Sequence, residues 1–300
     1  MKLYHYTSLA ALKNIIEKHG FWLTDLHYSN DPNEFSLTYE EFTNYIKKTG
    51  LEYPFKQYLF SESSIPLFYG IGFTCAQDSL SHWERYADNK KGVCIEIDSV
   101  KMLKTFGHCK PANLILENTL YSEQQKTKYI KKMVNESIER LKNYHFKYNM
   151  MYHVFEALEI IDLFTLSKIK FKANSYRDEQ EYRLMFVDDD NDRVLKNLVL
   201  PLAITQEAKN EILNLLKPKE DFTYKYKLTK EDKKFYISSL GLNSYYELTF
   251  GDSAHSLNKF INRIILGPMC LQNISALRDF LDFYGLTSVL IEKSNIQVSR

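Results

Sequence analysis

Glycine is scarce in this chain of 300 residues, with 10 in all. The motif G-x-x-x-x-G-K-[ST] does not occur, which excludes a P-loop at the level of motif, and no G-x-G-x-x-G is present. The G-x-S-x-G elbow of α/β-hydrolases and the H-E-x-x-H zinc motif are also missing. The common catalytic signatures therefore do not identify an activity.

Cysteine is also rare, and its four copies are isolated at Cys75, Cys94, Cys109 and Cys270. None forms a C-x-x-C pair, so we expect no structural zinc site and no other metal. The sequence shows no signal peptide, so the pattern predicts reduced thiols in a cytoplasmic protein. No stretch approaches the roughly 20 apolar residues of a membrane span, and we expect no membrane partner.

A strong net charge is lacking as well. The formal charge is +1, with 44% hydrophobic and 26% charged residues, which is the balance of a globular protein. This balance gives no global electrostatic case for nucleic-acid or membrane binding. Two local segments, 126–147 and 217–234, are rich in lysine. Each is typical of a solvated surface, and each is also able to contact phosphates.

Strand and helix patterns alternate along the chain without a steady βαβ rhythm, which favours an α+β fold. Leu3–Thr7 alternates as a strand, Ser8 is a suitable N-cap for the helix that follows, and Gly20 marks the end of that helix. We expect one domain over residues 1–300, with a helical insertion at about 110–170 and a smaller Lys/Tyr-rich insertion at about 217–240. Further strands are predicted at FWLTD, YGIGFTCA, VCIEID, EYRLMFV, NLVLPL, YYELTF, RIILG and SVLIEKS.

The stretch SYRDEQEYRLMF is the most informative in the sequence. If residues 179–186 form a strand, Glu179, Glu181 and Arg183 share one face. Two close carboxylates resist joint ionisation unless a cation lies nearby, and Arg183 is a candidate for that cation. A solvent-facing strand with a ladder of salt bridges explains the same letters equally well.

Three further groups have both a structural and a functional interpretation. His5 and Thr7 share a face of the first strand, where a lone histidine is more often structural than a ligand-binding residue. Trp83 and Tyr86 lie three apart, so a helix places them together, either for packing or as an aromatic wall for a planar ring.

The turn NDPNE contains the third group, Asp31 and Glu34. These carboxylates are placed to bind a ligand hydroxyl, although turn formation alone explains the Asn, Asp and Pro of this segment.

Five blocks in order, YHYTS, FWLTD, NDPNEF, FTCAQDSLSHWERYADNKKGVCIEID and EQEYRLMF, resemble the bacterial DUF2971 family of uncharacterised proteins. The resemblance covers most of the chain. It gives a family without a settled function.

The start of the chain also resembles the ADP-ribosyltransferase superfamily, in which a strand with a histidine precedes a helix that ends in glycine. This resemblance implies a mixed or antiparallel split β-sheet core. It places His5 at the first site position, and Glu179-Gln180-Glu181 at the E-x-E motif with Glu181 as the catalytic residue. Tyr86 is the choice for the middle aromatic residue, with Trp83 or Tyr69 as alternatives, because no motif fixes it.

The same resemblance implies cleavage of the nicotinamide–ribose bond of NAD, which would be a substrate. Glu181 would stabilise the oxocarbenium-like state, and Glu179 would orient or deprotonate an acceptor. His5 would hold a ribose hydroxyl or the nicotinamide amide, and Tyr86 would stack on the ring. The acceptor would be a protein, a nucleic acid or water. The protein would act as a toxin or phage-defence effector, either alone or with an antitoxin or other defence partner.

Two other functions remain open from the sequence. One is a non-catalytic protein that binds a nucleotide or an RNA end in the same cleft, with the lysine-rich segments contacting phosphates. The other is a hydrolase that uses Glu179 and Glu181 as an acid–base pair.

Overall fold

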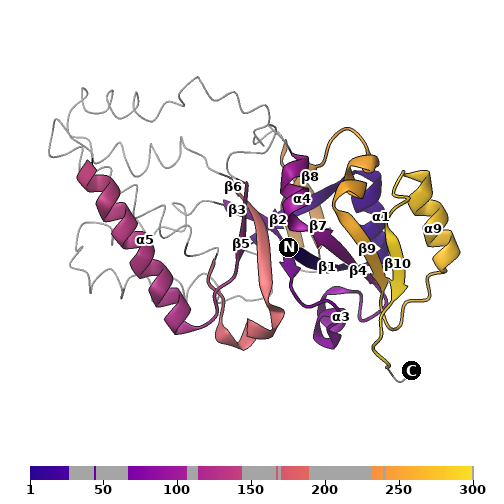
Figure 1. The fold of residues 1–300 in the computed structure, drawn as a ribbon, viewed down its shortest axis with the longest axis horizontal. Coiled ribbons are helices and arrows are strands. Elements are labelled where there is room, and N and C mark those ends of the chain that lie inside the picture. Colours follow the sequence, from indigo (N-terminus) through magenta and orange to yellow (C-terminus); the bar gives the residue numbers. More distant parts are fainter. Residues whose placement is uncertain are drawn as a thin grey trace.

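A computed structural model describes most of both ends of the chain and parts of its middle. The described residues are 1–26, 44, 67–106, 114–143, 167, 170–188, 232–238 and 241–298. Within these ranges, ten strands form one mixed sheet that packs with several helices (Figure 1). The predicted α+β class is confirmed.

Eight strands form the main path of the sheet. In spatial order they are β10 (Leu290–Lys293), β9 (Ile261–Leu266), β4 (Val93–Asp98), β1 (Lys2–Thr7), β3 (Leu67–Thr74), β2 (Gly20–Asp25), β8 (Gly241–Thr249) and β7 (Lys234–Ser238). Two more strands, β6 (Glu181–Asp188) and β5 (Leu114–Asn118), continue from β3 as a branch. Strands β9 and β10 pair in parallel and the other pairs are antiparallel, so the sheet is mixed.

Strand β3 has three neighbours, and this splits the sheet. One edge pairs with β6 over the whole length of β3, from Leu67 to Thr74. The other edge is shared, because β1 pairs only at Thr74 and β2 pairs only at Tyr69 and Gly70. The backbone of residues 71–73 therefore has no strand partner on that edge within the described part of the chain. The opening lies between β1 and β2.

Helix α1 (Leu9–Glu17) joins the two strands that border this opening. Its predicted N-cap is confirmed, since the hydroxyl of Ser8 accepts the backbone N–H of Ala11 at 3.1 Å. The prediction that Gly20 ends the helix is wrong. The residue with left-handed backbone after the helix is His19, with φ of 42°. Gly20 instead begins β2, and a Cβ added to Gly20 would lie 2.5 Å from the carbonyl oxygen of Leu248.

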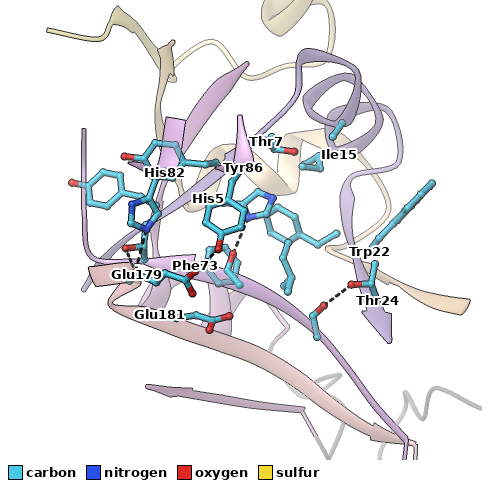
Figure 2. A pocket seen from close by; sticks show the side chains of 18 of the residues that line it. His5, Thr7, Ile15, Trp22, Thr24, Phe73, His82, Tyr86, Glu179 and Glu181 are labelled. Atoms are coloured by element: carbon cyan, nitrogen blue, oxygen red, sulfur yellow. Dashed lines mark hydrogen bonds between the residues drawn. The ribbon is translucent and has the colours of Figure 1, made fainter. Parts of the chain in front are cut away.

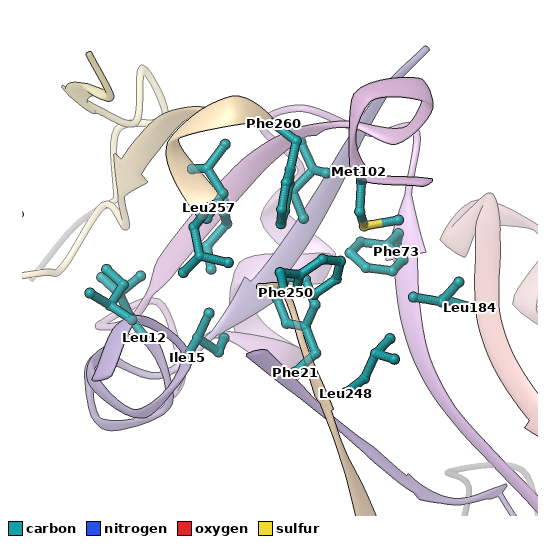
Figure 3. Close-up of a cluster of buried hydrophobic side chains, with 14 of the residues drawn as sticks. Leu12, Ile15, Phe21, Phe73, Met102, Leu184, Leu248, Phe250, Leu257 and Phe260 are labelled. Atoms are coloured by element: carbon teal, nitrogen blue, oxygen red, sulfur yellow. The ribbon is translucent and has the colours of Figure 1, made fainter. Parts of the chain in front are cut away.

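The main hydrophobic core lies between the sheet and the helices that cover it (Figure 3). Helix α1 contributes Leu12 and Ile15, whose spacing places both on one face. Aromatic rings from several strands meet these residues, and Phe250 contacts both Phe21 and Phe260. Burial of this apolar surface fixes β1, β2 and β3 as the frame around the opening.

The described residues also include further helices. They are α3 (Leu80–Tyr86), α4 (Ser99–Thr105), α5 (Glu123–Asn143), α9 (Ile274–Phe283), and the 3₁₀-helices η5 (Asn174–Glu179) and η9 (Ala254–Lys259). Figure 1 shows α9 beside β10 and α5 at the opposite end of the molecule. Among the described helices, none is both long and apolar enough to cross a membrane.

The two expected insertions are described only in part. The described part of the segment 110–170 contains α5 and also β5, which pairs with β6. The described end of the 217–240 segment forms β7 at the edge of the sheet. Both segments thus contribute a strand to the sheet. The strand predicted at NLVLPL lies outside the described residues.

Candidate functional site

A cavity of about 440 Å³ lies at the opening between β1 and β2. This volume is in the range of small-molecule sites, about 300–1,000 Å³. Residues from both faces of β1 line it, together with parts of α1, β2, β3 and α3. Figure 2 shows His5, Tyr86, Glu179 and Glu181 grouped in one part of the pocket and Trp22 in another.

His5 is fixed by the opening in the sheet. Its Nδ1 lies 2.9 Å from the carbonyl oxygen of Gly72, one of the β3 residues without a strand partner on that edge. A carbonyl only accepts, so Nδ1 carries the proton and Nε2 is an acceptor when the ring is neutral. Burial lowers the pKa of His5, although the bond to Gly72 opposes this effect, so the neutral form is favoured. The ring packs against Phe21 and Phe73.

Glu181 begins β6 and pairs with Thr74 of β3. Its Oε2 accepts hydrogen bonds from Arg183 at 2.8 Å and from Lys172 at 3.2 Å. Among the described residues, no donor reaches Oε1, and a Cβ on Gly72 would lie 3.0 Å from that oxygen. Burial raises the pKa of Glu181, but the charges of Arg183 and Lys172 outweigh it and the net pKa is lowered. The carboxylate is therefore ionised at neutral pH.

Glu179 also lines the pocket near Glu181, but it is not part of the predicted strand. It ends η5, and Gln180 follows with a left-handed φ of 44°, so the expected strand from residue 179 begins two residues later. The carboxylate of Glu179 accepts from Tyr86 at 2.5 Å and from Lys172 at 2.7 Å. The prediction that strand alternation places the two carboxylates together is wrong, because the shared lysine Lys172 brings them together.

Of the three aromatic candidates, only Tyr86 lines the pocket. Burial and the bond to Glu179 raise the pKa of its hydroxyl, which stays protonated. The prediction for Trp83 is wrong, because its indole is fully buried and donates to Asp78 at 2.6 Å. Tyr69 is likewise buried, with its hydroxyl 2.8 Å from that of Ser244.

The remaining candidates have different positions. Thr7 lines the pocket, close to the end of β1. Arg183 is 2% exposed and contacts Glu181, so β6 is not the solvent-facing strand of the structural interpretation. Asp31 and Glu34 lie outside the described residues.

Three pocket residues were missed by the sequence reasoning. Lys172 follows the middle segment and precedes η5, and no local motif marks it. His82 lines the pocket from α3, with Nε2 3.2 Å from the carbonyl oxygen of Glu179. Trp22 lines the far part of the pocket and stacks on Tyr245 with 4.2 Å between ring centroids. The sequence predicted only that Trp22 lies in a strand, and no other feature of the sequence pointed to its place in the pocket.

The donors present do not suggest a metal. Within the described ranges, no group of three or more His, Cys, Asp or Glu side chains is placed to hold an ion. The pocket instead offers one neutral acceptor at His5, one ionised oxygen at Glu181, and aromatic surfaces. This set suits an uncharged diol or sugar attached to a planar ring.

Comparison with known proteins gives one match. Residues 82–184 match the family model DUF2971, described as a protein of unknown function. The matched stretch contains Tyr86, Lys172, Glu179, Glu181 and Arg183, and His5 precedes it. Searches of curated proteins and of solved structures found no match.

Proposed function

Starting from a chain whose residues 82–184 match the DUF2971 family, we propose that it binds NAD and cleaves the nicotinamide–ribose bond. The activity would be that of an ADP-ribosyltransferase or an NAD glycohydrolase. The proposal rests on the resemblance of the first strand and the E-x-E motif to ADP-ribosyltransferases. A split sheet with a pocket at the split agrees with that resemblance.

The observation that carries the proposal is the position of His5 and Glu181 around one glycine. Nδ1 of His5 bonds the carbonyl of Gly72, and Oε1 of Glu181 lies beside the Cα of the same residue. Both side chains line one pocket although 176 positions separate them in the sequence. Two acceptors that each lie beside the same glycine suit the two hydroxyls of a ribose.

In the proposed mechanism, Nε2 of His5 accepts a hydrogen bond from one ribose hydroxyl and Oε1 of Glu181 accepts one from the 2′-hydroxyl. As the bond to nicotinamide breaks, positive charge develops on the ribose and nicotinamide leaves with the bonding electrons. The fixed negative charge of Glu181 stabilises this state more than the ground state. Water or an acceptor nucleophile then attacks the ribose carbon.

The other two site residues have supporting roles in this proposal. Tyr86 presents its ring to the pocket for stacking on nicotinamide. Both oxygens of Glu179 accept hydrogen bonds, so we assign it the role of holding Tyr86 and Lys172. The deprotonation of an acceptor, expected from the sequence, would require one of these bonds to break.

The hydrolase alternative is less well supported by the geometry. A general acid needs a carboxyl group whose pKa is raised, so that it carries a proton at neutral pH. The neighbouring cations instead lower the pKa of Glu181. The ionised form suits the electrostatic role in NAD cleavage.

The test is nicotinamide release from NAD by the purified protein, followed by chromatography. We expect Glu181→Gln to reduce the rate by about 10²-fold or more, the scale of losing one preorganised electrostatic group. Glu84→Gln is the matched control, because Glu84 is exposed and pairs with Lys90 away from the pocket. Absence of release by the wild type, or equal losses in the two variants, would reject the proposal.

A second variant tests the other side of the gap. His5→Ala should raise the KM for NAD and lower kcat, since it removes a contact to the ribose.

The nucleic-acid alternative has its own test. It would be favoured if the protein binds RNA in a salt-sensitive way and NAD has no effect on its Tm. A toxin or defence role becomes relevant only once cleavage of NAD is observed.

A further inference from the structure

The chain leaves the sheet after β5 and returns to the same place about 50 residues later. Leu120 and Phe171 form an isolated parallel bridge. The N–H of Leu120 donates to the carbonyl of Lys170 at 2.6 Å, and the N–H of Lys172 donates to the carbonyl of Leu120 at 3.1 Å. The two ends of the segment 121–171 are therefore fastened to each other.

Both of these fastened ends also hold Glu181. On the departing side, the N–H of Glu181 donates to the hydroxyl of Tyr121 at 2.8 Å, and its carbonyl accepts the N–H of Thr119 at 2.9 Å. On the returning side, Nζ of Lys172 donates to Oε2 of Glu181 at 3.2 Å. The backbone and the side chain of one residue are thus held by the two ends of one segment.

The contact with Lys172 is deeply buried. The side chain of Lys172 is 3% exposed, and its Nζ also donates to Glu179 at 2.7 Å. A lysine buried between two carboxylates has little freedom, because any other position would leave charges unpaired in a poorly solvated place. Oε2 of Glu181 is thereby anchored, and Oε1 is the oxygen presented to the pocket.

We propose that Tyr121 and Lys172 are positioning residues for Glu181, which fix the direction of its free oxygen toward the ligand. This inference rests on the proposed function for its catalytic meaning, but its structural content does not. The ends of the segment 121–171 then act as a support for the site.

The electrostatic surroundings of Glu181 decide how the proposal is tested. The titratable groups around it come from α3, the chain after β5, the chain before η5, η5 itself and β6; they are His82, Tyr86, Tyr121, Lys172, Glu179 and Arg183. Two of these are cations in contact with it, so removal of Lys172 should leave Arg183 as its cationic contact among the described residues.

The first measurement is independent of NAD. The protein is labelled with glutamate carrying ¹³C at the side-chain carboxyl, and the Glu181 signal is assigned by its loss in Glu181→Gln. We expect Lys172→Met to raise the titration midpoint of this signal by about 1–3 pH units, the usual effect of one close cation. Lys170→Met is the matched control, because Lys170 is similarly buried but pairs with Glu117 at 2.7 Å.

A milder variant covers the case in which Lys172→Met does not fold. Tyr121→Phe removes one hydroxyl and no charge, and we expect faster hydrogen exchange at the amide of Glu181 by about 10-fold or more, since that amide loses its acceptor. An unchanged midpoint in folded Lys172→Met, or unchanged exchange in Tyr121→Phe, would overturn the proposal.

The second measurement is nicotinamide release. Lys172→Met should lower kcat by about 10-fold or more with little change in KM, as found for residues that orient a catalytic group, and Lys172→Arg should recover part of the loss. Equal losses in Lys172→Met and Lys170→Met would indicate general destabilisation and reject the positioning role. If the wild type releases no nicotinamide, the proposed function fails, and the titration and exchange measurements still decide this inference.

Discussion

Gly72 lies against Glu181 so closely that a Cβ added to the glycine would be 3.0 Å from Oε1 of the carboxylate. Movement of Oε1 is restricted, because Oε2 of the same carboxylate accepts hydrogen bonds from Lys172 and Arg183. The carbonyl oxygen of Gly72 meanwhile accepts a hydrogen bond from Nδ1 of His5. One residue without a side chain therefore separates the two groups proposed to hold the ribose.

Gly72→Ala should impair the site more than the fold. The added methyl group displaces Oε1 by a few tenths of an ångström and occupies pocket volume. We expect kcat/KM for nicotinamide release to fall by on the order of 10-fold or more, because small misplacements of reacting groups are costly. Steady-state kinetics measures the effect, and circular dichroism checks that the fold is retained. Wild-type kinetics in this variant would contradict the site geometry.

Tyr86→Phe and Tyr86→Ala should separate the hydroxyl from the ring. The phenylalanine variant loses the hydrogen bond to the side chain of Glu179, and the free energy of unfolding should fall by about 1.5–3 kcal/mol, measured by urea titration. Its KM for NAD should stay close to that of the wild type, because the ring remains. The alanine variant should lose stability and should also raise the KM for NAD, because the ring is removed. If both variants raise KM equally, stacking is not the role of the ring.

Trp83→Ala should be a stability variant without a direct effect on ligand contact. The indole is fully buried, packs on Tyr6 with 4.8 Å between ring centroids, and bonds Asp78. We expect the free energy of unfolding to fall by about 3–5 kcal/mol. The KM of the folded fraction should change little at low temperature. A strong KM effect with unchanged stability would restore the sequence-based role of Trp83 as a ligand wall.

The stability of the protein should depend on pH through two histidines, His5 and His82. Burial lowers the pKa of His5 and of His82 in the folded state, below the ordinary value of about 6.5. As the pH falls below that value, the unfolded chain binds protons that the folded protein does not, so the free energy of unfolding decreases. Urea unfolding at pH 7 and pH 5 measures the decrease.

The double variant His5→Gln/His82→Gln provides the control for this dependence. It should show a smaller difference between the two pH values than the wild type. Carboxyl groups with lowered pKa values, such as Glu181, lose their contribution at lower pH, mostly below this window. An equal pH dependence in wild type and variant would show that these histidines titrate normally.

Local sequence patterns predicted much of the fold. The N-cap at Ser8 and the strands β2, β4 and β9 follow from capping residues and apolar spacing, which act over a few positions. The strands β5 and β7 were missed, because they lie in segments whose composition suggested helix or loop. Pairing of β5 with β6 and of β7 with β8 stabilises these strands, although their local sequence does not favour a strand.

The candidate site was predictable only in part. His5 and Glu181 were named through a resemblance, and the structure places both in one pocket. Lys172 could not be found, since nothing in the sequence shows that a residue nine positions before Glu181 turns back to bind it. The left-handed Gln180 was hidden for a similar reason, because glutamine has no strong turn preference and tertiary contacts impose the conformation.

Helix α1 has nine residues, and it alone connects the two strands whose divergence creates the pocket. A change of one residue in its length would shift the register of β2 and exchange its inward and outward side chains, so that the indole of Trp22 would turn away from the cavity. The length of this short connector should therefore govern which molecules the gap admits, and homologues with longer or shorter connectors should prefer ligands of a different size.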